Sequence, residues 1–326
     1  MGFWHAEFGG LKSSQFDNML RFIVRRLLVT IPTILVVITI TWALIKLAPG
    51  NFYSGEKPLS PAIEQTIREK YGLDKPWYQQ YGKTMWSILR HLDFGTSLRF
   101  EGQSVNSIIK RSLPVSAAVG ILAYLLALIV GITAGSIAAL KQNSKWDYGS
   151  MALAMLGISV PNFVLGPILV IVFSLWLYWF PPSRWNGFPS RNLVLPVLTL
   201  SAVYIAYIAR LTRAGMLEVL RSDYIRTARA KGLSEKDVVI RHALRGGLMP
   251  VVSFTGPALA FLLTGTVVVE RIFALPGLGN YFIQASLNRD EPLIIGIVAF
   301  IALTLLTMNL LVDIAYAYLD PRVRYQ

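Results

Sequence analysis

Long stretches without a charged residue alternate with short basic segments along most of the chain. Crossing the hydrocarbon core of a bilayer takes roughly 20 apolar residues, and six stretches reach or approach that length. They are Leu27–Ile45, Leu113–Leu140, Tyr148–Pro182, Asn192–Ala209, Gly246–Val269 and Pro292–Val312. Helical periodicity is weak within them, as is typical of a helix that is apolar on all sides. The pattern predicts an all-α membrane protein with six transmembrane helices.

Composition supports this class and removes several others. Only 15% of the 326 residues are charged, where a soluble domain has about a quarter, and the mean hydropathy is +0.52. There is no cysteine, which excludes disulfides and thiolate metal sites. The histidines His5, His91 and His242 lack the spacing of metal ligands, and no stretch matches the phosphate-binding P-loop.

Basic residues near the ends of the stretches predict the orientation, because Lys and Arg favour the cytoplasmic side. Arg21, Arg25 and Arg26 place the start of the first helix in the cytoplasm. Four crossings then return the segment 210–245 to that side, and six return the C-terminal tail. The same bias accounts for the net charge of +13, so the basic composition does not indicate nucleic-acid binding. Residues 48–112 then form a long extracytoplasmic loop between helices 1 and 2.

The predicted organisation has five parts. They are a polar N-terminal extension at 1–18, transmembrane helix 1 at 19–47, an extracytoplasmic loop domain at 48–112, helices 2–6 at 113–320 with a cytoplasmic segment at 214–245, and a cytoplasmic tail at 321–326. The extension has no apolar core and no cleavage site of a secretory signal. Met19 is an alternative start, and the sequence leaves the choice open.

The external loop has helix-start signals in Ser60, Pro61 and Glu64 and is rich in aromatic residues. Two interpretations of these aromatics stay open: they rest on the membrane interface or pack a small core of the loop, or they form a docking surface for an external partner. The aromatic residues concerned are Trp77, Tyr78, Tyr81 and Trp86.

Charged residues are confined to the ends of the stretches, which argues against an ion-coupled pathway. Lys46, Glu270 and Asp313 are expected to have structural roles, with side chains that snorkel toward water. Asn162, Ser253, Thr255 and Asn309 are candidates for a pathway lining or for hydrogen bonds between helices. Gly131 and Gly135 form a G-x-x-x-G face that allows close helix approach, and bent helices at the prolines suit a rocking motion.

A basic segment, "SDYIRTARAKGLSEKDVVIRHAL", lies between the fourth and fifth stretches. Ser222 is a candidate N-cap and Gly232 a candidate left-handed helix end. Ser234 with Asp237 forms a capping box for a second helix. Tyr224 and Ala228 share one face of the first helix, and small neighbours keep that face thin. We expect it to dock into a groove of another protein.

Several separated motifs resemble one protein family. "YIRTARAKGLSEKDVVIRHAL" looks like the cytoplasmic motif of bacterial ABC importer permeases. "LDKPWYQQY", "LDFGTSL", "AALKQNSKWDY" and "ERIFALPGLG", in this order, look like the first permease subunit of oligopeptide and dipeptide importers. The general motif opens with Glu-Ala-Ala and closes on Leu-Pro. This chain departs from it at Arg226 and Arg245, so the contacts of these two arginines stay open.

The resemblance implies a permease in the bacterial inner membrane without catalytic residues, metal or cofactor of its own. A second permease would share its pathway, two ATPases would bind ATP and Mg²⁺, and an external binding protein would deliver short peptides. Alternatives are another cargo such as nickel or glutathione, a self-sufficient channel or secondary carrier, and a non-transporting assembly subunit. The ATPase-coupling residues implied are Asp223, Tyr224, Ile225, Thr227, Ala228, Arg229, Ala230, Lys231, Gly232 and Leu233.

The predicted orientation can be tested by labelling, because the chain has no cysteine. Single cysteines replacing Ser144 and Glu235 should resist an impermeant thiol reagent in intact cells. A cysteine replacing Gln103 should react, because it lies in the external loop. The reverse labelling pattern would overturn the orientation.

Overall fold

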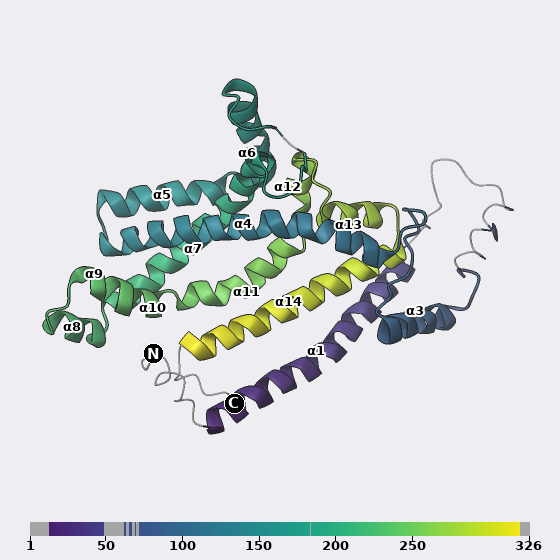
Figure 1. Cartoon of the computed structure of the whole chain (residues 1–326), viewed down its shortest axis with the longest axis horizontal. Coiled ribbons are helices and arrows are strands. Elements are labelled where there is room, and N and C mark those ends of the chain that lie inside the picture. The colour runs from purple at the N-terminus through teal and green to yellow at the C-terminus, as the bar shows by residue number, and fades with distance from the viewer. Residues whose placement is uncertain are drawn as a thin grey trace, which may run out of the picture.

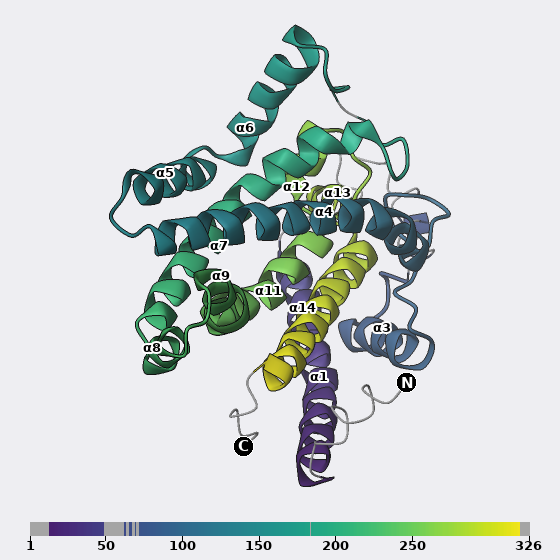
Figure 2. The same ribbon diagram turned by 60° about the vertical axis from the view of Figure 1, so that its left-hand side comes forward.

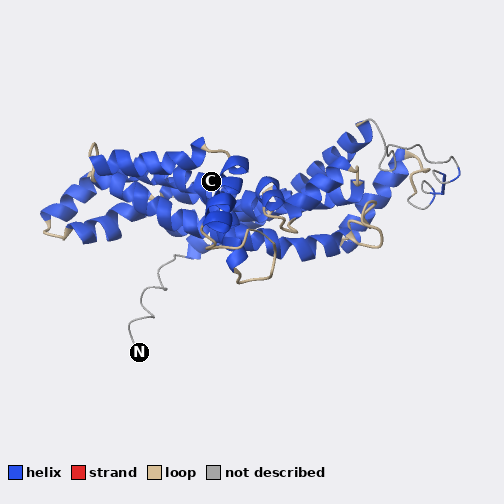
Figure 3. Ribbon diagram, turned by 90° about the horizontal axis from the view of Figure 1, so that it is seen from above, coloured by secondary structure: helices blue, strands red, loops and turns tan. Residues whose placement is uncertain are grey.

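Helices make up most of the chain that the structure describes (Figures 1 and 3). The computed structural model describes residues 13–48, 72–182 and 184–319, together with positions 62, 65, 66 and 69. Within these residues the only β-type pairing is an isolated bridge between Thr96 and Ser104. The expected helix start at Ser60, Pro61 and Glu64 lies outside the described residues.

The first and last membrane helices pack against each other, and a side-chain ion pair joins them near each end. Helix α1 (Ser13–Leu47) begins before the predicted start at residue 19 and packs against α14 (Glu291–Leu319). Arg26 Nη2 lies 2.9 Å from Asp313 Oδ2, and Lys46 Nζ lies 2.7 Å from Glu291 Oε2. The residues between the two α1 cations span about 30 Å at 1.5 Å per residue, the thickness of a hydrocarbon core.

Two helices form the centre of the molecule. Helix α4 (Val105–Leu140) crosses α7 (Val194–Leu220) with almost no space between their backbones. A Cβ at Gly135 would lie 2.4 Å from the carbonyl oxygen of Ala209, and one at Gly131 would lie 2.8 Å from Ile208 Cβ. The close approach predicted from the G-x-x-x-G pattern is therefore confirmed.

Helix α4 extends further out of the apolar stretch than predicted. It begins at Val105, inside the segment expected to be loop, and Ser104 caps it by accepting the Ser107 N–H. Just before it, residues 97–99 are bound by Asp290, which is fully buried ahead of α14. The Asp290 carboxylate accepts the Ser97 hydroxyl and the backbone N–H groups of Leu98 and Arg99. This carboxylate joins the external loop to the last membrane helix.

The third apolar stretch does not form one straight helix. It consists of α5 (Lys145–Ser159), α6 (Asn162–Leu169) and the π-helix η1 (Val170–Trp176), with a bend of 102° at the break. Pro161 lies at this break, and Val160 before it is extended with φ −100° and ψ 113°, because the proline ring disfavours the helical conformation of the preceding residue. Five helices of the described chain are long enough to span a bilayer, or six if this bent pair counts as one span.

The fifth stretch is also interrupted. It contains α10 (Leu244–Gly247), α11 (Met249–Leu263) and α12 (Val267–Ile272), and Gly265 with φ +98° separates the last two. Helix α13 (Leu278–Leu287) follows. Helices α12 and α13 lie with α3 (Trp77–His91) at one end of the molecule.

The side chain of Glu270 on α12 was expected to extend toward water, but it is buried. Glu270 is 2% exposed, and its carboxylate accepts hydrogen bonds from the Ser116 hydroxyl at 2.7 Å and from the Asn280 N–H at 3.0 Å. A Cβ at Gly277 would lie 2.3 Å from the Glu270 carboxyl carbon, so the loop has no space for a side chain there. Because a buried charge requires hydrogen-bond donors, the backbone folds around the carboxylate.

The ends of the membrane helices lie at two opposite ends of the molecule (Figures 1 and 2). The start of α1, the end of α14 and the turn between α4 and α5 lie toward the end that carries α8 (Asp223–Ala230), α9 (Glu235–Asp237) and α10. Helices α3, α12 and α13 lie at the opposite end. This arrangement is the one that an even number of crossings predicts.

Close packing at Gly157 provides a stability test within a single helix. A Cβ there would lie 2.1 Å from the Ala202 carbonyl oxygen, whereas one at Gly149 on the same helix meets nothing within 4 Å. Gly157→Ala should destabilise the protein by about 1–3 kcal/mol through overpacking. Gly149→Ala should leave stability unchanged or raise it, because alanine favours helix. The readout is the midpoint of thermal unfolding in mild detergent, and equal midpoints for the two variants would contradict the packing.

Candidate functional site

The basic segment between α7 and α11 folds onto the end of α7 as a compact unit. Helix α8 (Asp223–Ala230) is followed by α9 (Glu235–Asp237) and the π-helix η3 (Val238–Ala243), which continues through α10 into α11. Figure 1 shows this unit at one extreme of the molecule. Ile225 and Ala228 on α8 are buried in a small apolar cluster that also contains Ala139, Met216, Val238 and Ala243.

The predicted docking face of α8 is wrong in one respect. Ala228 is only 6% exposed and faces its own chain, whereas Tyr224, Thr227 and Ala230 are exposed. The reason is the position of Ile225, which lies three residues before Ala228 and takes the shared helix face into the apolar cluster. A partner can therefore contact the Tyr224–Thr227–Ala230 side of α8 and not the side of Ala228.

Caps at the two helices agree in part with the prediction. Gly232 has φ +78°, the left-handed conformation expected after the first helix, and Ser234 Oγ accepts the Asp237 N–H at 3.2 Å. Ser222 does not cap with its side chain, because its hydroxyl donates instead to the Val219 carbonyl oxygen at 2.6 Å. The turn is thus defined by glycine and by the second cap.

An ion pair bridges the turn. Arg229 Nε lies 2.7 Å from Glu235 Oε1, and Arg229 Nη2 lies 3.3 Å from Glu235 Oε2. The guanidinium lowers the pKa of Glu235, and the carboxylate raises the pKa of Arg229. The depressed pKa means that the pair is intact at neutral pH and is lost as the pH falls through the folded-state pKa of Glu235. Of the other predicted coupling residues, Asp223, Lys231 and Leu233 are exposed beside this turn.

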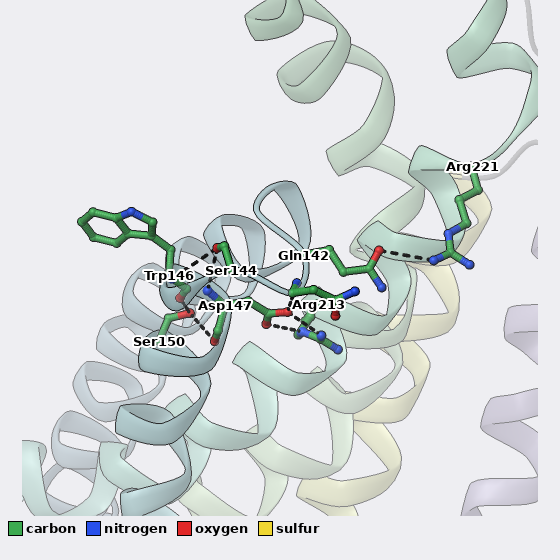
Figure 4. Close-up of polar contacts among 8 residues, drawn as sticks. Gln142, Ser144, Trp146, Asp147, Ser150, Arg213 and Arg221 are labelled. Carbon is green, nitrogen blue, oxygen red and sulfur yellow. Dashed lines mark hydrogen bonds and ion pairs between the residues drawn. The ribbon is translucent and has the colours of Figure 1, made fainter.

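A second ion pair ties α5 to α7 on the same side of the molecule (Figure 4). Asp147 is 2% exposed and accepts Arg213 Nε and Nη2, both at 2.7 Å. Its carboxylate also accepts the Asn143 N–H at 3.0 Å. Next to it, Arg221 at the end of α7 donates to Gln142 at 3.3 Å. Sequence reasoning missed this pair, since an acid near a helix start and an arginine 66 positions later carry no local signal.

The polar residues inside the spans do not converge on one site. Thr255 accepts the Tyr124 hydroxyl at 2.7 Å, and the Ser253 hydroxyl donates to the Met249 carbonyl oxygen. Asn309 lies beside Gly256, where α14 touches α11, while Asn162 begins α6. Within the described residues no cluster of His, Asp and Glu could hold a metal ion. Among the residues that the structure describes, these polar side chains therefore take part in helix packing.

Comparison with solved structures supports the fold alone. The structure resembles a chain in an inward-facing crystal form of the MetNI methionine ABC transporter, with a TM-score of 0.55 and 15% sequence identity. The similarity covers 65% of this chain and 96% of that one.

Sequence comparison identifies the family. The oligopeptide transport system permease protein OppB of Escherichia coli is 46% identical over 307 residues, covering 94% of this chain and 100% of that protein. The dipeptide transport system permease protein DppB of Bacillus subtilis is 42% identical over 306 residues, covering 94% and 98%. The profile "Binding-protein-dependent transport system inner membrane component" matches residues 131–325, and its N-terminal companion matches residues 19–120. The chain therefore belongs to the family of inner-membrane components of binding-protein-dependent transport systems.

Proposed function

We propose that this protein is a permease subunit of an ATP-driven importer of short peptides. The carrying observation is its similarity over 94% of its length to permeases named for oligopeptide and dipeptide transport. The folded unit α8–η3 supports the same function, because it presents an exposed helix face outside the membrane spans. Nickel or glutathione remain alternative cargoes for a related permease, and no observation favours them.

Energy for transport must come from another protein under this proposal. The sequence has no P-loop, so two partner ATPases would bind ATP and Mg²⁺ and dock at α8. A second permease would complete the pathway, and an external binding protein would deliver the peptide. The α8 end, with the start of α1 and the end of α14, would then face the cytoplasm.

The contacts around α8 indicate how a movement of a docked ATPase could be transmitted to the membrane helices. The buried face of α8 holds Ile225 against the end of α7, so the short helix moves with that end as one body. From α7 the motion passes to α5 through the Asp147–Arg213 ion pair, which has two parallel hydrogen bonds. The bent α5–α6 arm therefore follows α7. This linkage converts a movement at the docking face into a rearrangement of the membrane helices.

The cargo assignment makes a biochemical prediction. Spans without charge suit a path that accepts varied side chains, so selectivity should lie mainly in the binding protein. The reconstituted complex should hydrolyse ATP faster with peptide only when the binding protein is present. Equal stimulation of ATP hydrolysis by peptide alone would refute this assignment of selectivity. Stimulation by nickel or glutathione with their binding proteins would identify that solute as the cargo instead of peptide.

Two alanines on α8 allow the docking face to be tested with one and the same substitution. Ala228→Leu adds bulk at a buried position and should lower the free energy of unfolding by about 1–3 kcal/mol. Ala230→Leu adds the same bulk at an exposed position, so it should leave stability unchanged. It should weaken binding of the ATPases about tenfold, which corresponds to ~1.4 kcal/mol.

Measurement uses thermal unfolding in detergent and the amount of ATPase that co-purifies. Lys236→Gln, on the exposed α9, serves as a control that should change neither quantity. Normal ATPase binding and normal coupled transport by Ala230→Leu would mean that this side of α8 does not contact the ATPase.

The glycine that ends α8 provides a separate test. Gly232 has φ +78° but open space around it, so Gly232→Val meets no neighbour and introduces only backbone strain, about 1–2 kcal/mol. We expect the variant to insert normally and to lose the dependence of ATP hydrolysis on peptide. Gly232→Asn should retain more coupling than valine, because asparagine tolerates the left-handed conformation. Equal coupling by both variants would show that the turn geometry is unimportant.

A further inference from the structure

Helix α3 in the external loop has two apolar surfaces, and only one of them is buried in the protein. Met85 and Ile88 face inward and pack with Ile38 and Trp42 of α1. The Tyr81 ring lies edge-on to Trp42 at 5.3 Å, and Trp77 lies 6.5 Å from the same ring. Part of the aromatic cluster predicted for the loop is therefore a core between α3 and α1.

The contacts also place α3 at a depth along α1. The Tyr81 hydroxyl is hydrogen-bonded to Thr39 Oγ1 at 2.8 Å, and Gln80 accepts the Lys46 ammonium at 2.8 Å. Seven residues separate Thr39 from Lys46, which is about 10 Å along the helix axis. On these same turns Ile40 and Leu44 of α1 are exposed, and such apolar side chains on a membrane helix face lipid. Helix α3 thus lies beside a part of α1 that is within the bilayer.

A second apolar surface of α3 is left uncovered in this chain. Trp86 and Leu89 are 60% and 59% exposed, and Leu92 follows them at the end of the helix with 72% exposed. Next to this edge lie Lys83 and Arg90, and the Arg90 guanidinium is 5.3 Å from the centre of the Trp86 ring. The sequence of α3, "WYQQYGKTMWSILRH", contains no acidic residue.

We propose that α3 is an in-plane helix of the outer membrane leaflet. Its edge of Trp86, Leu89 and Leu92 enters the boundary between headgroups and acyl chains, while Lys83 and Arg90 contact anionic phospholipid headgroups. Three observations agree on lipid as the occupant: the depth along α1, the apolar edge, and the two cations on a helix that itself has no acidic residue. This combination is typical of interfacial helices, and tryptophan favours this level of the bilayer.

The inference is independent of the proposed cargo. If α3 is anchored in the leaflet and bound to α1, the external segment that follows it starts from a fixed point. That segment runs through residues 97–99, held by the buried Asp290, directly into α4. The outer leaflet would thus help to position the external face of the permease.

The experiment uses two single cysteines in the cysteine-free chain. Leu89→Cys places a label on the apolar edge, and Lys83→Cys places it about 120° away on the same helix, since six residues turn the helix by about 600°. Both sites are exposed, so neither substitution disturbs the core. Each variant is labelled with a small environment-sensitive fluorophore and reconstituted with its partner subunits into bilayers containing phosphatidylglycerol. Quenching is measured with brominated phospholipid and with aqueous iodide.

For a leaflet-anchored α3, brominated lipid should quench the Leu89 label about threefold more strongly than the Lys83 label, and iodide should show the opposite order. Three results would overturn the proposal. The first is equal quenching of both labels by iodide, which would place α3 in water. The second is a Leu89 label that neither quencher reaches, which would show that protein covers the edge. The third is a Leu89 label that is shielded from iodide only when the external binding protein is present, which would make the edge a protein-docking surface.

Discussion

Backbone contact between α4 and α7 is the constraint on which the rest of the structure depends. At Gly131 and Gly135 a side chain is sterically impossible, because the facing atoms of α7 occupy the position of a Cβ. In a membrane the hydrophobic effect does not drive helices together, so such close van der Waals packing is a main source of cohesion. Two segments extend from this pair: α4 turns into α5, and α7 leads into α8. A change in their contact would therefore displace both ends of the molecule.

Several charged groups at the ends of the membrane helices stabilise the arrangement of these helices. The pairs Arg26–Asp313 and Lys46–Glu291 join α1 to α14 at the two edges of the apolar slab. The buried carboxylates of Glu270 and Asp290 are surrounded by hydroxyl and backbone N–H donors. Burying a carboxylate is unfavourable without such donors, which explains why the loops around both residues are tightly folded. These particular charged groups thus have structural partners.

Each end of the molecule has a short helix with one buried face and one exposed face. At one end, the short helix α8 buries Ile225 and Ala228 on its own chain and exposes a different face. At the other end, α3 buries Met85 and Ile88 and exposes a second edge. In both cases one apolar face packs against the rest of the chain, and the other face is exposed. A short helix that is marginal by itself becomes a rigid contact element through such packing.

Local patterns in the sequence determined the all-helical class, the apolar stretches, the glycine contact between α4 and α7, and the left-handed turn at Gly232. Each of these depends on length, spacing or the conformational freedom of one residue, which neighbours in the sequence express directly. Only the tertiary structure decided that Ile225 turns Ala228 inward, that the third stretch bends by 102°, and that Glu270 is buried. The Asp147–Arg213 pair likewise joins residues 66 positions apart. The physical reason is that a helix face, a bend or a buried charge depends on the atoms packed against it, and those atoms come from distant parts of the chain.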